Sequence, residues 1–198
     1  MAVYSSRMPD PGDISDTRRP PVYTRTGDDG TTGLLFGGRV AKNAPAPVAY
    51  GDVDEAQAAI GAARAAAGGD DTRLDEILIG LARDLWVAMA ELATAPENRS
   101  KLTAGATLVT PAMVAHLEDL IDDTAARFEL PAEFVVPGED PAAALLDVAR
   151  TVVRRAERSS LGVAPSESLV VPYLNRLSDL LWTLARWREG ESRRVRDV

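Results

Sequence analysis

The segment Thr72-Arg-Leu-Asp-Glu-Ile-Leu-Ile-Gly-Leu-Ala-Arg-Asp-Leu-Trp-Val-Ala-Met-Ala-Glu-Leu-Ala93 has the regular apolar spacing of a helix that lies in a protein core. Its apolar residues recur at three- and four-residue steps, at Leu74, Ile77, Leu78, Leu81, Leu85, Met89 and Leu92. Such steps bring side chains onto one face of an α-helix, and that face must be buried against other elements. The segment therefore predicts a core helix, with Trp86 at the edge of its packed face.

Four further helices are expected around this one. The first begins near Asp52, whose side chain can cap it, and runs to about Ala67. The others run from Thr110 to about Phe128, from Asp140 to Leu161, and from near Pro172 to about Glu189. Their expected core residues are Met113, Leu117, Leu120 and Ile121, then Leu145, Ala149, Val152 and Ala156, and finally Leu174, Leu177, Leu181 and Leu184.

The first of these helices also has a face of small residues, at which another helix can approach closely. That face consists of Ala58, Gly61, Ala62 and Ala65. Apolar residues make up 45% of the chain and aromatic residues only 5%. This composition, rich in Ala and Leu, favours an all-α fold packed through small side chains.

The length of 198 residues suits one domain with irregular ends. We expect a disordered N-terminal arm over residues 1–21, a domain over residues 22–189 and a frayed tail over residues 190–198, because the ends lack apolar periodicity.

Three connecting segments are also expected. Residues 43–47 are rich in proline and predict a short extended connector. Residues 94–109 have no period and predict an exposed loop. Residues 130–139 predict a loop between two long helices, and it contains Phe134, an aromatic residue that periodicity does not assign to a core.

Composition and charge exclude several classes of function. A formal net charge of −8 argues against nucleic acid and anionic membrane surfaces as partners, so an anionic ligand must meet a local basic patch. The absence of cysteine excludes disulfides, thiolate metal sites and cysteine nucleophiles. The single histidine, His116, is expected at the surface and not as a metal ligand. No apolar run reaches transmembrane length and no signal-peptide core is visible, so the cytoplasm is the expected compartment.

The N-terminal segment Tyr23-Thr-Arg-Thr-Gly-Asp-Asp-Gly-Thr-Thr-Gly33, closed by Lys42, is suited to a polyphosphate. We refer to residues 23–42 as the strap. Its glycines allow backbone N–H groups to approach an anion, while Arg25 and Lys42 supply positive charge. The hydroxyls of Thr24, Thr26, Thr31 and Thr32 can donate to phosphate oxygens. The segment fits neither the P-loop nor the dinucleotide pattern, and a mobile, turn-rich arm is the alternative interpretation.

A row of charged residues lies on one side of the helix expected from Asp140. Arg150, Arg154, Glu157 and Arg158 recur at positions i, i+4, i+7 and i+8. The row could bind phosphates, and a solvated charged face is the alternative. In the last helix, Asn175 and Asp179 are one turn apart, and a carboxylate near Arg154 or Arg158 would orient a guanidinium group for a ligand.

Five blocks of sequence, in this order, resemble the PduO-type ATP:cob(I)alamin adenosyltransferases. They are the strap with Arg39-Val-Ala-Lys42, Tyr50-Gly-Asp-Val-Asp-Glu55, Phe134-Val-Val-Pro-Gly138, Ala149-Arg-Thr-Val-Val-Arg-Arg-Ala-Glu-Arg158 and Tyr173-Leu-Asn-Arg-Leu-Ser-Asp-Leu-Leu181. The resemblance covers about residues 22 to 188. It implies a five-helix bundle with a ferritin-like up-down arrangement and an N-terminal nucleotide-binding loop, assembled as a homotrimer with active sites between subunits.

The same resemblance implies the reaction. The 5′-deoxyadenosyl group of ATP is transferred to the cobalt of cob(I)alamin, triphosphate is released, and Mg²⁺ accompanies the nucleotide. An electron-donating reductase and an adenosylcobalamin-dependent mutase are the implied partners. The sequence shows no motif for a dedicated metal site in the protein.

Site residues follow from the resemblance position by position. Thr24, Arg25, Thr26, Gly27, Thr32, Gly33 and Lys42 would surround the ATP phosphates, and the nucleotide site would be completed by Arg154, Arg155, Glu157, Arg158 and Asn175. Asp54 and Arg150 resemble a pair that braces the cobalamin side across the subunit interface. Phe134 resembles the aromatic that displaces the lower axial base, and Asp179 would position an arginine. Arg154, Asp54, Arg150 and Asn175 are the expected catalytic residues.

Some positions depart from the family pattern. Asp29 replaces the usual lysine, Glu139 stands where a second glycine is common, and Asp147 occupies a place often held by His. Two other classes of function therefore stay open. One is a non-catalytic carrier or sensor of cobalamin and ATP with the same fold, and the other is a helical interaction protein without a ligand.

Overall fold

The computed structural model describes residues 22–69 and 71–198, and the arm expected over residues 1–21 lies outside them. Helix α1 (Pro45–Ala67) begins well before Asp52, so the prediction of an extended connector over residues 43–47 is wrong. Proline is tolerated at the start of a helix because first-turn N–H groups need no partner inside it. Ala44, which makes no side-chain cap, precedes the helix, and Gly68, with φ 73°, follows it.

Helix α2 (Thr72–Leu92) confirms the core helix, and the side chain of Asp71 caps it by accepting from the Leu74 N–H at 3.1 Å. Trp86 is 54% exposed and lies at the edge of the packed face, bordering a groove between α2 and α1. The expected loop over residues 94–109 contains a 3₁₀ helix, η1 (Pro96–Lys101). The two ends of the loop, at Thr94 and Val109, are buried.

The remaining helices are α3 (Pro111–Ala125), α4 (Pro141–Ser160) and α5 (Val170–Glu189). The caps predicted for α3 and α4 are confirmed, since Thr110 and Asp140 accept from backbone N–H groups at 3.3 and 2.9 Å. Helix α3 ends before Phe128. The buried apolar residues of α4 are Ala142, Ala143, Leu146, Ala149, Val153 and Ala156. Leu145 and Val152, which we expected among them, are only half-buried.

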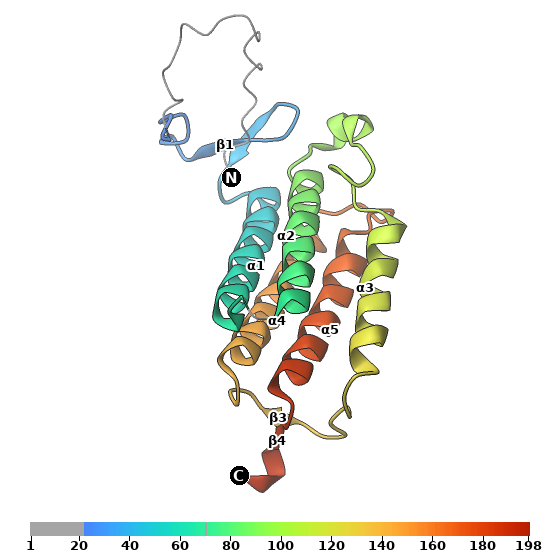
Figure 1. Ribbon diagram of the computed structural model, residues 1–198. Coiled ribbons are helices and arrows are strands. Elements are labelled where there is room, and N and C mark those ends of the chain that lie inside the picture. The colour runs from blue at the N-terminus through green and yellow to red at the C-terminus, as the bar shows by residue number, and fades with distance from the viewer. Residues whose placement is uncertain (1–21, 70) are drawn as a thin grey trace, which may run out of the picture.

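Consecutive helices run in opposite directions, so the bundle is of the up-down type (Figure 1). Helix α4 packs against both α1 and α5, α1 also packs against α2, and α3 lies on the outer side of α5. In the part of the chain that the structure describes, five α-helices form this all-α bundle, which confirms the predicted fold class.

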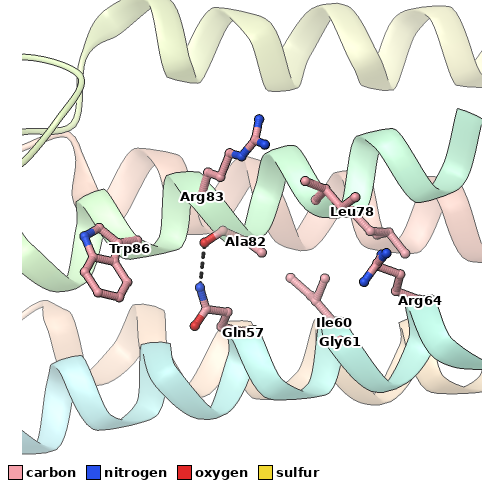
Figure 2. Close-up of a pocket in the computed structure, with 9 residues that line it drawn as sticks. Gln57, Ile60, Gly61, Arg64, Leu78, Ala82, Arg83 and Trp86 are labelled. Carbon is pink, nitrogen blue, oxygen red and sulfur yellow. Dashed lines mark hydrogen bonds between the residues drawn. The ribbon is translucent and has the colours of Figure 1, made fainter. Parts of the chain in front are cut away.

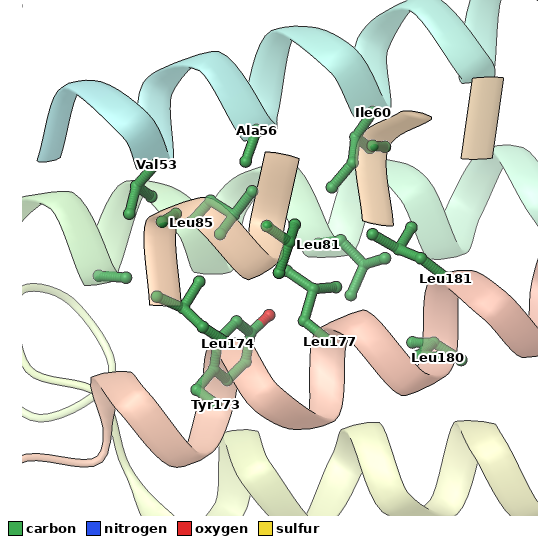
Figure 3. Packing of buried hydrophobic residues seen from close by; sticks show 14 of the residues in the cluster. Val53, Ala56, Ile60, Leu81, Leu85, Tyr173, Leu174, Leu177, Leu180 and Leu181 are labelled. Atoms are coloured by element: carbon green, nitrogen blue, oxygen red, sulfur yellow. The ribbon is translucent and has the colours of Figure 1, made fainter. Parts of the chain in front are cut away.

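Leucines from α2 and α5 fill the centre of the bundle, and smaller side chains from α1 and α4 complete it (Figure 3). Tyr173 and Leu177 of α5 are fully buried, as is Ile60 of α1. The expected stripe of the last helix is confirmed, because Leu174, Leu177, Leu181 and Leu184 are all buried. Truncating one of these leucines to alanine would remove about 2–5 kcal/mol of stability.

Short strands lie at the two ends of the bundle (Figure 1). Strands β1 (Thr31–Gly33) and β2 (Arg39–Ala41) form an antiparallel hairpin within the strap, near the start of α1. At the opposite end, β3 (Val135–Val136) pairs with β4 (Arg193–Arg194), which is followed by a 3₁₀ helix, η2 (Val195–Asp197). The prediction of a frayed tail over residues 190–198 is therefore wrong. Two-residue strands have too little periodicity to be read from a sequence.

Glu91 organises the end of the bundle that carries the strap. Its side chain is 1% exposed and accepts from Arg99 Nη2 at 2.8 Å, Val109 N at 2.8 Å and Ser168 Oγ at 2.6 Å. A buried carboxylate needs such partners, because an unpaired charge is strongly unfavourable away from water. Glu91 thus holds two loops against the end of α2, and next to it Leu35 of the strap donates its N–H to Ala93 O at 2.8 Å.

Asp84 of α2 accepts a hydrogen bond from the hydroxyl of Tyr173 in α5, with 3.1 Å between the oxygens. Burial raises the pKa of Asp84 above its ordinary value, while this hydrogen bond and the nearby His116 act in the opposite direction. Burial also raises the pKa of Tyr173 well above its ordinary value, so the hydroxyl remains a donor. His116 itself is exposed, as predicted.

We expect Asp84→Asn to stabilise the protein at about pH 8 and to lose this advantage as the pH falls toward the ordinary aspartate pKa of 3.8. The pKa of Asp84 is raised by folding, so the folded state favours the protonated form and the ionised form reduces stability at high pH. The asparagine oxygen can still accept from Tyr173 without carrying charge. Urea unfolding of both proteins across this pH range measures the difference, and a difference independent of pH would contradict the assignment.

Candidate functional site

The strap brings Gly27 and Lys42 together. The Lys42 N–H donates to Gly30 O at 2.9 Å, which folds the first part of the strap back over this lysine. A Cβ atom at Gly27 would lie only 3.1 Å from Lys42 Nζ and 3.2 Å from Thr31 O. Glycine at this position therefore allows the ammonium group to lie directly against the backbone. Two residues predicted to bind phosphate are neighbours in the structure.

The start of the strap is exposed and strained. The hydroxyls of Thr24 and Thr26 are 2.8 Å apart, and the Arg25 guanidinium lies 5.6 Å from the centre of the Tyr23 ring. Arg25 has φ 60°, in the left-handed region that is unfavourable for a residue with a Cβ. Strain of this kind clusters at ligand-binding segments, and it adds to the reasons for placing a binding site here.

Asp29, which replaces a lysine in the family pattern, orders the strap. Its Oδ1 accepts from the backbone N–H of Thr31 at 2.9 Å and from the hydroxyl of Thr31 at 2.7 Å. These bonds from Thr31 are the main reason that the pKa of Asp29 is lowered, and Arg39 at 3.7 Å adds to the effect. The Thr31 hydroxyl is therefore engaged by Asp29 and by Arg39, and in this arrangement it is not the free phosphate donor that we expected.

Arg39 was missed as a site residue by the sequence reasoning. It donates to Thr26 O at 2.5 Å and, through Nε, to Thr31 Oγ1 at 3.0 Å, and so joins the two arms of the strap. The signal was the Arg-Val-Ala-Lys block that contains Arg39. An arginine three residues before Lys42 in a glycine-rich segment needs anionic or carbonyl partners for its donors.

The arginines of α4 divide into two groups. Arg154 and Arg158 are exposed, Arg158 Nη1 donates to Arg154 O at 3.0 Å, and no carboxylate among the described residues forms an ion pair with either. Arg155 turns instead to α1, where it pairs with Glu55 and with Asp52 at 3.5 Å. Glu55 is the main cause of the raised pKa of Arg155. The single chain thus leaves Arg154 and Arg158 open to an anion and holds Arg155 in an ion pair.

Glu157 and Asn175 are brought together across α4 and α5. Asn175 Nδ2 donates to Glu157 Oε1 at 3.1 Å, as a shared site requires. Asp179 does not lie beside Arg154 or Arg158 as we expected. Its nearest cation is Arg176, at 3.9 Å, and Arg176 is bound more closely by Glu118 at 2.9 Å. Asp179 is thus drawn to a neighbour on its own helix.

Phe134 borders a pocket at the other end of the bundle. Its side chain is 90% exposed, and the pocket has a volume of about 800 Å³. The walls come from the loop over residues 130–139, from α4 and α5 and from the C-terminal segment, and include Pro137, Arg150, Trp182, Val195 and Arg196. A large exposed aromatic at the rim of a mixed pocket marks an interaction site.

Asp147 explains how Arg150 is held at this pocket. Asp147 Oδ1 accepts from Arg150 Nε at 3.1 Å, and Oδ2 accepts from Arg186 Nη2 at 2.6 Å. Arg186 is 1% exposed and also lies 3.1 Å from Glu189 Oε2 through its Nε atom. The sequence reasoning noted Asp147 only as a departure and missed Arg186. Arg186 is two residues beyond Leu184 and lies off the leucine stripe of the last helix, so the sequence pattern gave no signal of this buried ion pair.

Asp54 and Arg150, the expected pair, make no ion pair with each other in one chain. Asp54 is exposed on α1 and shares its face with Ala58, Gly61, Ala62 and Ala65, which are also exposed. The small-residue face therefore does not pack inside the bundle, and the close approach of another helix that we expected at this face is not made within one chain. In one chain, α1 uses a different set of alanines to contact its neighbours.

A further groove lies between α1 and α2 and is separate from the expected site (Figure 2). Gln57 Nε2 donates to Ala82 O at 2.6 Å across it, and Trp86 and Leu78 form part of its apolar lining. Among the described residues, no group of three His, Cys, Asp or Glu side chains could hold a metal ion. In the same part of the chain, no helix has the length and apolarity to cross a membrane.

The fold and its cationic side chains define the class of the molecule, a helical bundle with a glycine-rich strap at one end and an exposed arginine row. Residues 22–188 match the model of the cobalamin adenosyltransferase family. The chain therefore belongs to this enzyme family, and the resemblance noted in the sequence is confirmed.

Similar proteins agree with this membership. A corrinoid adenosyltransferase of Mycobacterium tuberculosis is 45% identical over 186 residues, which cover 87% of this chain and 95% of that protein. The corrinoid adenosyltransferase PduO of Salmonella typhimurium is 37% identical, over 86% of this chain and 50% of the longer relative. A solved PduO-type ATP:corrinoid adenosyltransferase variant from Lactobacillus reuteri, complexed with cobalamin and ATP, has a TM-score of 0.79 and 27% identity, with 89% and 97% of the two chains covered.

We expect Gly27→Ala to weaken ATP binding by about tenfold, equivalent to about 1.4 kcal/mol, without lowering the stability of the bundle. The new methyl group would displace the Lys42 ammonium group from its place against the strap. Titration calorimetry with ATP and Mg²⁺ measures the affinity. Gly80→Ala, in the middle of α2 with open space around its Cβ position, is the matched control. Equal ATP affinity in both variants would exclude this role of Gly27.

Proposed function

We propose that this protein transfers the 5′-deoxyadenosyl group of ATP to the cobalt of cob(I)alamin and releases triphosphate. The observation that carries the proposal is that Arg154 and Arg158 on α4 are exposed and form no ion pair with the described residues, in a chain whose strap holds Lys42 against Gly27. Together with the family membership, these two cationic features suit a substrate whose leaving group is a polyphosphate.

The proposed chemistry requires few groups from the protein. Cob(I)alamin is a strong nucleophile, so a cobalt–carbon bond forms at C5′ while the bond from C5′ to oxygen breaks and its electron pair leaves with triphosphate. The protein must align the two substrates and stabilise the negative charge that develops on the leaving group. Arg154, Arg158 and Lys42 supply positive charge for this purpose, while the Glu157–Asn175 hydrogen bond connects the two helices beside them.

Mg²⁺ is proposed to enter with the nucleotide. Mg²⁺ usually binds proteins through substrate phosphates and water, so the triphosphate of ATP would be its main ligand. The charge of the ion would add to that of the arginines at the triphosphate.

The corrinoid is proposed to bind at the Phe134 pocket. The exposed ring of Phe134 offers an apolar surface beside Arg150, whose guanidinium is held by Asp147. An apolar group next to the lower face of the corrinoid would exclude water and favour the form that has lost its lower axial base. Asp147, which stands where the family often has His, is then the residue that positions Arg150.

We propose a homotrimer with its active sites between subunits, in the cytoplasm. Two observations support the assembly. The first is that the exposed small-residue face of α1 is continuous with Asp54. The second is that Asp54 forms no ion pair with any described residue of its own chain. A flat helix face of Ala and Gly allows close approach of another helix, and a neighbouring subunit would bring a partner for Asp54. A reductase that supplies cob(I)alamin and a mutase that uses the product are the proposed further partners.

Mixing the protein with ATP, Mg²⁺ and chemically reduced cob(I)alamin tests the reaction, because the Co(I) absorbance falls on turnover. We expect Arg154→Ala to lower kcat by about a hundredfold or more, the usual effect of removing one donor to a developing anion. Its helicity should not change, since Arg154 is exposed. Arg127→Ala, at an exposed ion pair beyond the end of α3, is the matched control and should keep full activity.

Other outcomes would contradict the proposal. A spectral shift of the corrinoid without adenosylcobalamin would indicate the carrier or sensor, and no spectral change would indicate a bundle without a ligand. Full activity of a folded Arg154→Ala protein would also count against the assigned site.

We expect Ala62→Trp to convert the trimer to monomers, because a large side chain would separate helices that meet through small residues. Native mass spectrometry measures the oligomer. Ala115→Trp, at an exposed alanine of α3, is the matched control and should stay trimeric. A monomeric parent protein, or a trimeric Ala62→Trp variant, would refute the assigned interface.

A further inference from the structure

We propose that residues 191–198, named here the C-terminal clamp, hold the loop over residues 130–139 so that Phe134 is in position before the corrinoid binds. This role rests on the proposed function, because it concerns the corrinoid end of the same site. Nothing in the sequence pattern pointed to it, since this segment was expected to be frayed.

Main-chain hydrogen bonds connect the clamp to Phe134 itself. Strand β4 pairs with β3 immediately after Phe134, with Val135 opposite Arg194 and Val136 opposite Arg193. The ladder continues one step further, because the Val195 N–H donates to Phe134 O at 3.0 Å. The backbone of Phe134 is therefore held directly, although its side chain is 90% exposed.

Ion pairs hold the loop on both sides of the aromatic residue. Arg193 Nε lies 2.8 Å from Glu139 Oε1, and Arg196 Nη2 lies 2.9 Å from Glu133 Oε1. Glu139 is the residue that replaces a common glycine of the family, and its partner on the clamp gives a reason for that replacement. Each pair is exposed and weak by itself, but together they fix the register of a strand pair that would be marginal alone.

The direction of the clamp is set by the same buried ions that hold Arg150. Ser192 Oγ donates to Glu189 Oε2 at 2.9 Å, Glu189 lies next to Arg186, and Arg186 binds Asp147. Asp147 in turn accepts from Arg150. A continuous series of polar contacts thus joins the clamp to the arginine on the other side of the Phe134 pocket.

The expected consequence is confined to one substrate. If the clamp is released, the loop must be ordered when the corrinoid binds, and this ordering reduces the affinity. The strap and the exposed arginine row toward the end of α4 do not contact the clamp, and the strap lies at the opposite end of the bundle (Figure 1). The clamp should therefore affect the KM for cob(I)alamin and leave the KM for ATP unchanged.

Charge reversal in the full chain tests the clamp. In Arg193→Glu/Arg196→Glu, both clamp side chains would repel their glutamates, and we expect the KM for cob(I)alamin to rise about tenfold with the KM for ATP unchanged. Adding Glu139→Arg and Glu133→Arg should restore the ion pairs in reverse and lower this KM again. Arg194→Glu is the matched control, because Arg194 lies on the same strand and no ion pair is found for it among the described residues.

Hydrogen exchange separates failure of the clamp from failure of the proposed function. The Val195 amide should exchange faster in the charge-reversed protein than in the parent or the control, with or without turnover. An inactive parent would refute the proposed function and leave the exchange result as the test of the clamp. Unchanged exchange, or a KM for ATP that rises as much as that for cob(I)alamin, would overturn the clamp.

Discussion

The close packing of α4 against α1 through small side chains is the constraint on which the rest of the structure depends. The buried residues of α4 include Ala142, Ala143, Ala149 and Ala156, and those of α1 include Ala49, Ala56, Ala63 and Ala67. Backbones that approach this closely leave no room for long side chains between them. The arginines of α4 must therefore lie at the flanks, where Arg155 pairs with α1 and Arg154 and Arg158 remain exposed. The basic surface of an acidic protein is thus a result of its packing.

The parts that the sequence predicted well are those with strong local signals. Helix α2 was visible from its leucine spacing, and Thr110 and Asp140 were visible as caps because their side chains bond to N–H groups only three residues away. The start of α1 was missed because proline, which usually marks an extended connector, also fits the first turn of a helix. The stripe of α4 was shifted because this helix is buried on two sides, by α1 and by α5.

Those contacts of the candidate site that join residues close together in the sequence were predictable. Lys42 meets Gly27 within the strap, as its glycine-rich sequence suggests. Contacts between distant elements could not be read in the same way. Arg186 reaches Asp147 from another helix, whereas Asp179 does not reach the arginines of α4. The face of α1 that carries Asp54 is open in one bundle, so the contact proposed for this residue is with a neighbouring subunit.

The two ends of the molecule differ in how their local structure is closed. The strap hairpin joins residues that are near in sequence, so little chain entropy is lost when it forms, and it can re-form by itself after opening. The β3–β4 pair joins segments separated by two whole helices, so it exists only while α4 and α5 are docked. Its contact order is high, and such contacts form late in folding. Fluctuations at the two ends are therefore of different kinds. Those at the strap are local, whereas the other end, once opened, can close again only while the folded bundle keeps its two strands near each other.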